Sequence, residues 1–178
     1  NNDHPNFLNI HDCFEVIRGF NYVVSHLEKV KNNKELLGPN VIDNVERGLK
    51  YSMEDITWAH QEQSKIYNNF RKFFENYDVL LCPAASVSPF PHEQLFVEEI
   101  NNEKLPTYMR WLALSYAPTM AIPCAWALPC GLDHKNLPFG IQLIAPAGND
   151  AKLSEIALAI EDALSNYEET KRAIPDIV

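Results

Sequence analysis

The sequence predicts an α/β fold, and two observations along the chain predict it. Apolar residues recur at helical spacing through the first part of the chain, which indicates a helical segment over about residues 11–76. Two short apolar runs, residues 77–83 and 139–145, have the length and composition of buried strands. We therefore expect residues 1–178 to form a single α/β unit whose strand-containing segment covers about residues 77–170.

The helical segment divides into three predicted helices. The first covers residues 11–31, and a short second helix follows the Gly-Pro-Asn sequence at residues 38–40 and stops near Gly48. The third begins at Ser52 and Asp55, whose spacing resembles a capping box with Asp in place of Glu or Gln. The apolar stripe expected on the first helix is Val16, Ile17, Phe20, Val23, Val24, Leu27 and Val30.

The strand-containing segment opens with YDVLLCP at residues 77–83, which we expect to be a strand buried on both faces. Residues 83–104 hold several prolines and no clear period, so we expect an extended loop there. Further along, the pattern predicts a helix over residues 106–116, a strand over 119–124 and a turn over 129–133.

The last two predicted elements are a strand over residues 139–145 and a helix that follows Gly148. Asn149 or Asp150 is expected to be the N-cap of this helix. Its buried stripe is expected to consist of Leu153, Ile156, Ala157, Ile160 and Leu164.

Composition and charge exclude several classes of partner. The formal net charge of -9 argues against binding to nucleic acid or to an anionic membrane surface, because both require a basic face. No apolar run reaches the ~18 residues that a membrane span needs. The first ten residues lack both a signal-peptide pattern and an initiator methionine, so we expect a processed chain or a piece of a longer one.

The cysteines and histidines give no pattern typical of a metal site. The 4 cysteines include no C-x-x-C pair, and we expect reduced thiols in a cytoplasmic protein. Cys124, Cys130 and His134 have a spacing that fits no common zinc site, so neither a metal nor a cofactor is expected. Cys82 ends a strand, but Pro83 follows it and no helix start can activate the thiol, so we expect Cys82 to pack.

Three segments of the second half together resemble the amidase signature family. YDVLLCP at residues 77–83 resembles the family's "YDvLLtPt" strand, and APTMAIPC at 117–124 resembles "lPaisvPcG". LPFGIQLIAP at 137–146 resembles "lPvGlQliG" and is the most specific of the three. The resemblance covers about residues 14–164. It implies the C-terminal portion of an α/β/α amidase-signature fold, with a mixed sheet flanked by helices, as part of a larger amidase domain.

The resemblance also implies what this chain lacks. The family's serine nucleophile, its bridging serine and its lysine lie in an earlier Gly/Ser-rich region. This chain has 6 glycines, none adjacent to another, and Ser86 and Ser88 have neither flanking glycines nor a lysine at a useful spacing. We therefore assign no catalytic residue. Ala125 and Ala145 stand where the family has glycine, which bears on the substrate class and leaves the fold prediction unchanged.

Gln142 is a polar residue in the middle of an apolar strand. An unpaired buried amide costs about 1–3 kcal/mol, so this side chain must find partners. We expect it to satisfy backbone groups of the adjacent proline-rich segments, as a structural buried polar residue; a direct contact with substrate is the alternative.

The family resemblance implies a substrate-pocket wall that includes Cys82, Ala84, Tyr116 and Trp126. For the aromatic residues, packing in the core is the alternative to lining the pocket. The expected substrate is a small-molecule amide, bound in the full-length protein.

Two functions of different classes follow. The first is a part of an amidase-signature hydrolase that cleaves carbon–nitrogen amide bonds through a serine acyl-enzyme, inactive as an isolated chain and partnered by the N-terminal part of the same polypeptide. The second is a non-catalytic binding or assembly subunit with an amidase-like fold, or a part of an amidotransferase. A fragment of a sheet is also expected to pair edge to edge, as a homo-oligomer.

Overall fold

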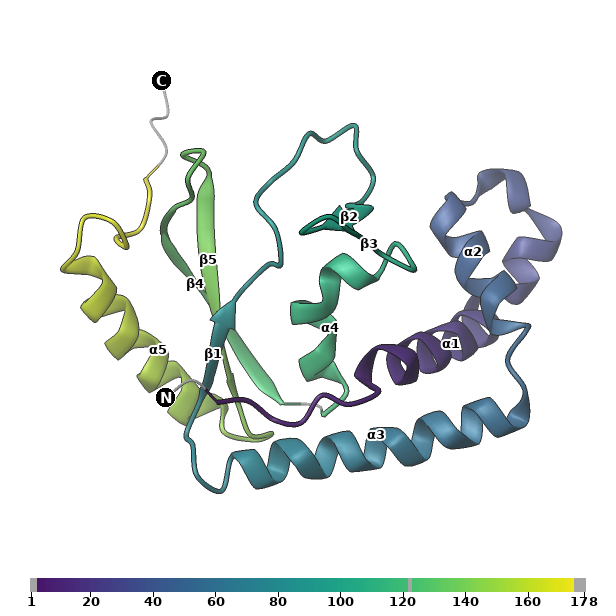
Figure 1. Cartoon of the computed structure of the whole chain (residues 1–178), viewed down its shortest axis with the longest axis horizontal. Coiled ribbons are helices and arrows are strands. Elements are labelled where there is room, and N and C mark those ends of the chain that lie inside the picture. Colours follow the sequence, from purple (N-terminus) through teal and green to yellow (C-terminus); the bar gives the residue numbers. More distant parts are fainter. Residues whose placement is uncertain (1–2, 122, 175–178) are drawn as a thin grey trace. The chain divides into compact units, whose positions relative to one another are not determined.

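The computed structural model describes residues 3–121 and 123–174, drawn in Figure 1. The chain divides into two compact units. The helical unit comprises Asn6–Asn69, and the sheet unit comprises Asn1–Pro5 together with Phe70–Val178. No helix among the described residues is long and apolar enough to cross a membrane.

The helical unit confirms the three predicted helices. They are α1 (Ile10–Asn32), α2 (Pro39–Gly48) and α3 (Met53–Phe73), and a single 3-10 turn, η1 (Lys34–Leu36), joins the first two. α3 runs from the helical unit into the sheet unit, since the boundary between them lies at Asn69.

The predicted capping box starts α3. The Ser52 hydroxyl oxygen accepts a hydrogen bond from the Asp55 backbone N–H at 3.1 Å. In return, the Asp55 carboxylate accepts from the Ser52 backbone N–H at 2.8 Å. Two N–H groups that have no partner within the helix are thereby satisfied, and this fixes where the helix begins.

α1 and α2 approach closely because a glycine from each lies at their contact. A Cβ atom built on Gly48 would lie 2.2 Å from the carbonyl oxygen of Gly19 and 2.7 Å from a methyl carbon of Val23. Val23 therefore faces α2, while its neighbour Val24 is 72% exposed. The prediction that both valines belong to the buried stripe is wrong for Val24, because consecutive helical residues are rotated by about 100°.

Gly48→Ala should destabilise the helical unit, because the added methyl group meets rigid backbone of α1. An overpacked contact of this kind costs about 1–3 kcal/mol, so the thermal unfolding midpoint should fall. Gly38→Ala is the matched control, since nothing lies within 4 Å of its Cβ position and its backbone is extended. Equal midpoints for the two variants would show that the two helices are not in close contact.

A buried carboxylate lies at the start of α1. Glu62, on α3, is 6% exposed. It accepts from the side-chain amide of Asn9 at 3.2 Å and pairs with Lys65 at 2.9 Å. Asn9 precedes α1 with a left-handed backbone, φ 61°. The ammonium of Lys65 lowers the pKa of Glu62 below its usual value, since it favours the charged form.

This pair should make the stability of the helical unit depend on pH. A carboxyl whose folded pKa is lowered stabilises the fold above its unfolded pKa, and this contribution disappears as the pH falls through the folded pKa. Glu62→Gln should therefore lower the unfolding midpoint at pH 7, by about 1 kcal/mol of stability. The difference between variant and wild type should shrink below about pH 4.5, the ordinary value for this carboxyl. A difference that stays constant down to pH 3 would contradict the assignment.

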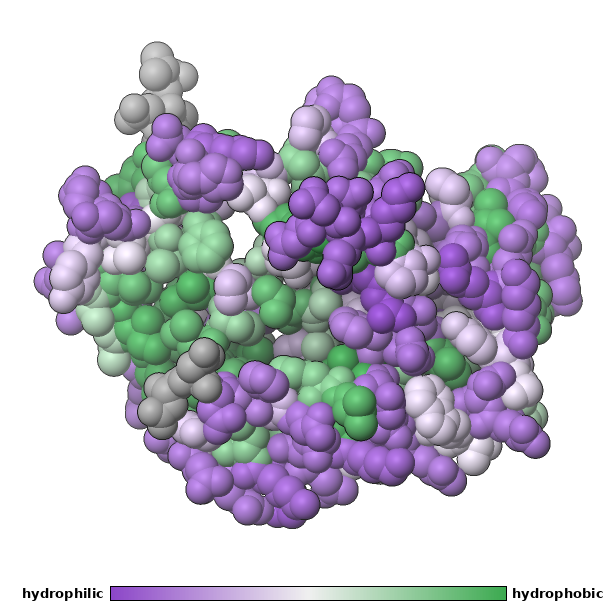
Figure 2. Space-filling model, in the orientation of Figure 1, coloured by the Kyte–Doolittle hydropathy of each residue, from purple (hydrophilic) through white to green (hydrophobic). Residues whose placement is uncertain are grey.

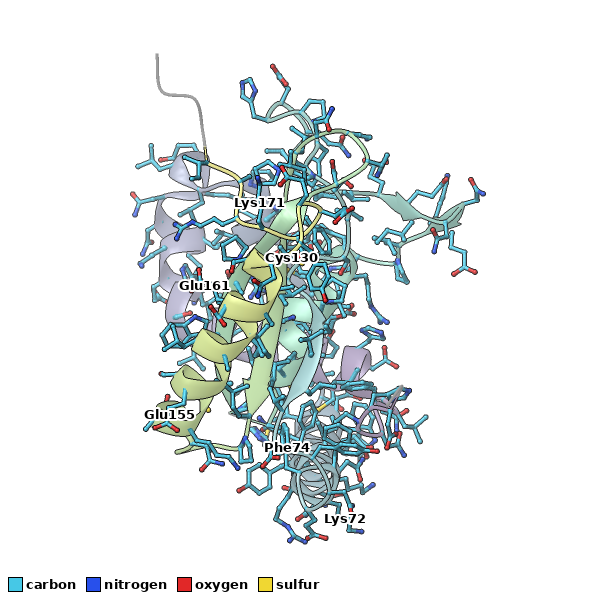
Figure 3. All side chains as sticks on the ribbon, turned by 90° about the vertical axis from the view of Figure 1, so that its left-hand side faces the viewer. Lys72, Phe74, Cys130, Glu155, Glu161 and Lys171 are labelled. Atoms are coloured by element: carbon cyan, nitrogen blue, oxygen red, sulfur yellow. The ribbon has the colours of Figure 1, made fainter. Side chains whose placement is uncertain are left out.

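The sheet unit is built on three antiparallel strands in the order β1-β5-β4. They are β1 (Leu80–Pro83), β4 (Cys124–Leu132) and β5 (Pro138–Ala145). α5 (Asp150–Ser165) packs on one face of this sheet, as Figure 3 shows with α5 in front of the strands. Their shared apolar core consists of Leu128, Ile141, Leu143, Ala145, Leu153 and Ala157.

The central strand β5 and the closing helix α5 lie where the sequence predicts. β5 begins one residue before the predicted start, and Asn149 occupies the N-cap position of α5, though its side chain makes no capping hydrogen bond. β1 also forms, but the expectation that it is buried on both faces is wrong. Leu81 is 50% exposed, because it lies on the edge strand of the face on which α5 packs mainly against β4 and β5.

The segment before β4 differs most from the prediction. A short turn, η2 (Arg110–Leu112), leads into α4 (Ala113–Thr119), so the predicted strand over residues 119–124 is wrong at Thr119, which is helical, whereas Cys124 does lie in a strand. Residue 122 of that prediction lies outside the described residues. β4 begins at Cys124 and continues to Leu132, so most of the predicted turn at residues 129–133 becomes an irregularity of the strand.

Gly131 accounts for the irregularity of β4 between Pro129 and Leu132. Its φ is +69°, and a Cβ atom on it would lie 2.0 Å from the carbonyl oxygen of Glu169, which follows α5. The hairpin turn follows the end of β4 at Leu132, where the Asp133 carboxylate accepts from the backbone N–H groups of Lys135 and Leu137. A side chain therefore closes the β4–β5 hairpin, as aspartate commonly does in turns.

The predicted loop over residues 83–104 contains one element that the prediction misses. β2 (Glu99–Ile100) and β3 (Glu103–Lys104) form a small hairpin. Asn101 and Asn102 connect them, with φ values of 54° and 64°. Two consecutive left-handed residues define a type I′ turn, which asparagine tolerates better than most residues.

Candidate functional site

Gln142 lies at the centre of the sheet, directly opposite Cys82 of β1 and Ala127 of β4. Side chains alternate between the two faces of a strand, so Gln142 points away from the α5 face that its neighbour Leu143 occupies. The face that carries Cys82, Ala127 and Gln142, here called the Gln142 face, is the side on which α4 lies, since Gln142 contacts the backbone of that helix.

The Gln142 amide makes two hydrogen bonds to backbone carbonyls. Its Nε2 group donates to the carbonyl of Leu114 in α4 at 2.8 Å and to that of Pro83 in β1 at 3.2 Å. Both partners are acceptors, which fixes the orientation of the amide. The sequence predicts that Gln142 has a structural role, in which its amide satisfies backbone groups of the adjacent proline-rich segments. These two bonds support that role, which stays a proposal.

Two other predicted pocket residues lie near this face. Ala84 directly follows β1. Because side chains alternate between faces, its methyl group lies on the same face as Cys82. A Cβ atom built on Gly140 of β5 would lie 3.5 Å from that methyl group. Tyr116 belongs to α4 and is 5% exposed, so its ring is largely enclosed in the sheet unit.

The structure separates Trp126 from the other predicted pocket residues. Trp126 is opposite Leu143, whose side chain lies on the α5 face, and Trp126 is 44% exposed. It therefore lies on the far side of the sheet from Cys82. Because side chains alternate along a strand, no single pocket on one face can hold both residues.

The environment of Cys82 is that of a packed thiol. Partial burial raises the pKa of this thiol above its ordinary value, and the neighbouring Gln142 amide opposes that shift. A raised pKa leaves little thiolate at neutral pH, whereas a catalytic cysteine needs a lowered one. This agrees with the interpretation of Cys82 as a packing residue.

Alkylation of Cys82 with iodoacetamide should therefore be slow at pH 7 and should accelerate as the pH rises beyond about 9, the ordinary thiol value. The measurement is peptide-mapped mass spectrometry of the native chain. Cys13 provides an internal reference, because burial raises the pKa of its thiol to about 11. Rapid labelling of Cys82 at pH 7 would instead indicate an activated thiol.

The residues weighed for metal binding pack elsewhere. Cys124 and Cys130 lie against the apolar core between the sheet and α5, and Figure 3 labels Cys130 beside that helix. The Cys124 thiol contacts the carbonyl of Pro146 at 3.2 Å. Among residues 3–121 and 123–174, no group of three metal-ligating side chains comes together.

Ser88, one of the two serines considered as nucleophiles, has an acidic neighbour. The backbone N–H of Leu137 and the Ser88 hydroxyl both lower the pKa of Asp133. Activation of a serine hydroxyl requires a base that can take up its proton, and a carboxyl with a lowered pKa is a poor base. The structure therefore adds no support for Ser88 as a nucleophile.

A surface hollow of about 630 Å³ lies at the hairpin end of the sheet unit. It is lined by residues of the β4–β5 turn and of the segment after α5, among them Asp133 and Lys171. None of the predicted pocket residues lines it. The hollow is therefore a feature of the hairpin end and is separate from the Gln142 face.

Comparison with known proteins identifies the class to which this fold and face belong. The chain superposes on an amidase of known structure with a TM-score of 0.78 and 18% identity, over 88% of this chain and 36% of that one. At this identity the likeness shows the fold alone. The family model described as "Amidase" matches residues 14–153, and the chain belongs to this family of amidase signature proteins.

The curated relatives are more specific in name. The chain is 32% identical over 107 residues to a glutamyl-tRNA(Gln) amidotransferase subunit from Alkaliphilus metalliredigens, covering 60% of this chain and 21% of that protein. It is 34% identical over 102 residues to a glutamyl-tRNA(Gln) amidotransferase subunit from Clostridium acetobutylicum, covering 56% and 20%. The matched part thus spans about a fifth of the length of these relatives.

Proposed function

We propose that this chain is the C-terminal part of an amidase-signature hydrolase that cleaves carbon–nitrogen amide bonds through a serine acyl-enzyme. The match of the amidase family model to residues 14–153 is the observation that carries the proposal. The chain supplies part of the sheet and one wall of the substrate pocket. The nucleophile, the base and the oxyanion donors come from the N-terminal part of the same polypeptide.

The wall that the chain contributes is the Gln142 face with Cys82, Ala84 and Tyr116. These residues lie on or beside the sheet face that α4 contacts through the Gln142–Leu114 hydrogen bond. Trp126 acts from the opposite face, so its contribution is to packing at the sheet edge and not to this wall. A wall of small and aromatic side chains with few charges suits an uncharged amide substrate.

The isolated chain is expected to be inactive. Acyl transfer requires a nucleophile beside a base and donors directed at the developing oxyanion. The sequence has no Gly/Ser-rich run to provide them. Both outer strands, β1 and β4, also present an unpaired edge within the described residues. Leu81 and Trp126 are exposed on these strands, and Figure 2 shows green side chains gathered over the sheet and α5.

Amidotransfer is the second candidate for the complete protein. It is favoured by the curated relatives, whose names describe a component of a glutamyl-tRNA(Gln) amidotransferase. The first chemical half of such a reaction, attack on an amide carbonyl with release of an amine, is the same as in a hydrolase. The two candidates differ in the fate of the released nitrogen, which an amidotransferase passes to a second substrate and a hydrolase releases into solution while water takes the acyl group.

A serine-directed fluorophosphonate distinguishes these possibilities at their common step. The 178-residue chain and the product of the complete reading frame are treated in parallel and their masses compared. We expect an adduct on the longer product alone, because only that product holds the activated serine. Free ammonia from simple primary amides, measured with and without an acceptor that carries an activated carboxyl group, then separates hydrolysis from amidotransfer, since amidotransfer passes the nitrogen to that acceptor.

Two outcomes contradict the proposal. An adduct on the 178-residue chain would mean that it holds a nucleophile, and Ser86→Ala and Ser88→Ala would locate it. No adduct on either product would favour the non-catalytic alternative, a binding or assembly subunit. Heat-denatured samples of both products are the control for non-specific labelling.

A further inference from the structure

Pro118 lies inside α4 and leaves one helical carbonyl without its usual partner. In an α-helix, each backbone N–H donates to the carbonyl four residues earlier. Proline has no N–H, so the carbonyl of Leu114 cannot receive this bond from residue 118. The bond site is partly buried, and a carbonyl that is shielded from water without a partner costs about 1–3 kcal/mol, so a replacement donor stabilises the structure.

The Gln142 side chain occupies that position. Its Nε2 group donates to the same Leu114 carbonyl at 2.8 Å, a typical length for a good hydrogen bond. A side chain of the central strand therefore replaces the backbone donor that the helix lacks. The second bond, to the carbonyl of Pro83 at 3.2 Å, extends the link to β1.

We propose that Gln142 is a positioning residue, which supplies the hydrogen bond that Pro118 removes and so holds α4 against the Gln142 face. Through this bond it sets the position of Tyr116 relative to Cys82. The importance of that position for substrate binding rests on the proposed function, whereas the bond itself does not.

The geometry also argues against a direct substrate contact through the Gln142 N–H donors. A glutamine amide has two N–H bonds to donate, and two backbone carbonyls, those of Leu114 and Pro83, take them. A substrate group that needed this donor would have to break a bond that completes α4.

Two of the three segments that carry the family resemblance are connected through α4. Pro118 belongs to the segment APTMAIPC, and Gln142 belongs to LPFGIQLIAP. The proline creates the need for a donor and the glutamine meets it. Pro118 and Gln142 are therefore coupled, so substituting one should change how much substitution of the other lowers stability.

A double-mutant cycle on the 178-residue chain tests this coupling. The four proteins are wild type, Gln142→Leu, Pro118→Ala and the double variant, compared by thermal unfolding. We expect Gln142→Leu to lower the midpoint in the wild-type background. Alanine at position 118 restores an N–H for Leu114, so the same change should lower the midpoint by less than half as much in the Pro118→Ala background. Gln94→Leu, at an exposed loop glutamine, is the control and should leave the midpoint unchanged in both backgrounds.

A second readout reports on position and not on stability. If α4 leaves the Gln142 face, Cys82 becomes more accessible, so its alkylation at a fixed pH and well below the unfolding midpoint should accelerate several-fold in Gln142→Leu. The rate should return toward the wild-type value in the double variant. If Gln142→Leu does not fold, its rescue by Pro118→Ala becomes the expected result.

Additive midpoint shifts in the cycle, or a double variant that remains unfolded, would overturn the proposal. So would a Cys82 alkylation rate that Gln142→Leu leaves unchanged. None of these measurements depends on catalysis. Failure of the fluorophosphonate experiment would therefore reject the proposed function and leave the role of Gln142 standing.

Discussion

The sheet unit depends on β5, the central strand, which pairs with a strand on each edge and packs against a helix on each face. β5 forms hydrogen bonds with β1 along one edge and with β4 along the other. Leu143 and Ile144 are 0% and 1% exposed, so both faces of the strand are covered at its centre. α5 packs on one face, and α4 is held to the other through Gln142. A strand under these constraints must be apolar throughout, and a polar residue survives there only where backbone groups pair with it.

The elements that can be predicted from the sequence are those whose signals are local. The capping box of Ser52 and Asp55 lies within four residues, and the stripes of α1 and α5 lie within their own helices. The prediction around Pro118 is wrong because proline normally ends a helix or lies outside it. The donor that compensates for the proline is on β5, and no local pattern can show it. The turn at Asn101 and Asn102 does have a local signal, a pair of residues that tolerate left-handed backbone.

The candidate site shows the same division. The composition of the strand is enough to predict that Gln142 needs partners, and the family resemblance points to the segments that would provide them. The facing pair of Cys82 and Gln142 requires the strand register, which the sequence does not contain. The grouping of Trp126 with the other wall residues fails for a related reason. The face of the sheet on which the Trp126 side chain lies depends on where β4 begins. The predicted strand ends at Cys124, before Trp126, so the prediction assigns this residue to neither face.

The bond between Gln142 and Leu114 also carries a consequence for the order of folding. The two residues are 28 positions apart in the chain, and Gln142 is the later one. During synthesis from the N-terminus, α4 would leave the ribosome with an incomplete hydrogen-bond ladder and would wait for β5 to emerge. The β4–β5 hairpin should therefore form before α4 becomes stable, even though α4 precedes both strands in the sequence. A helix is usually an early and local event in folding, but this one is completed by its tertiary contacts.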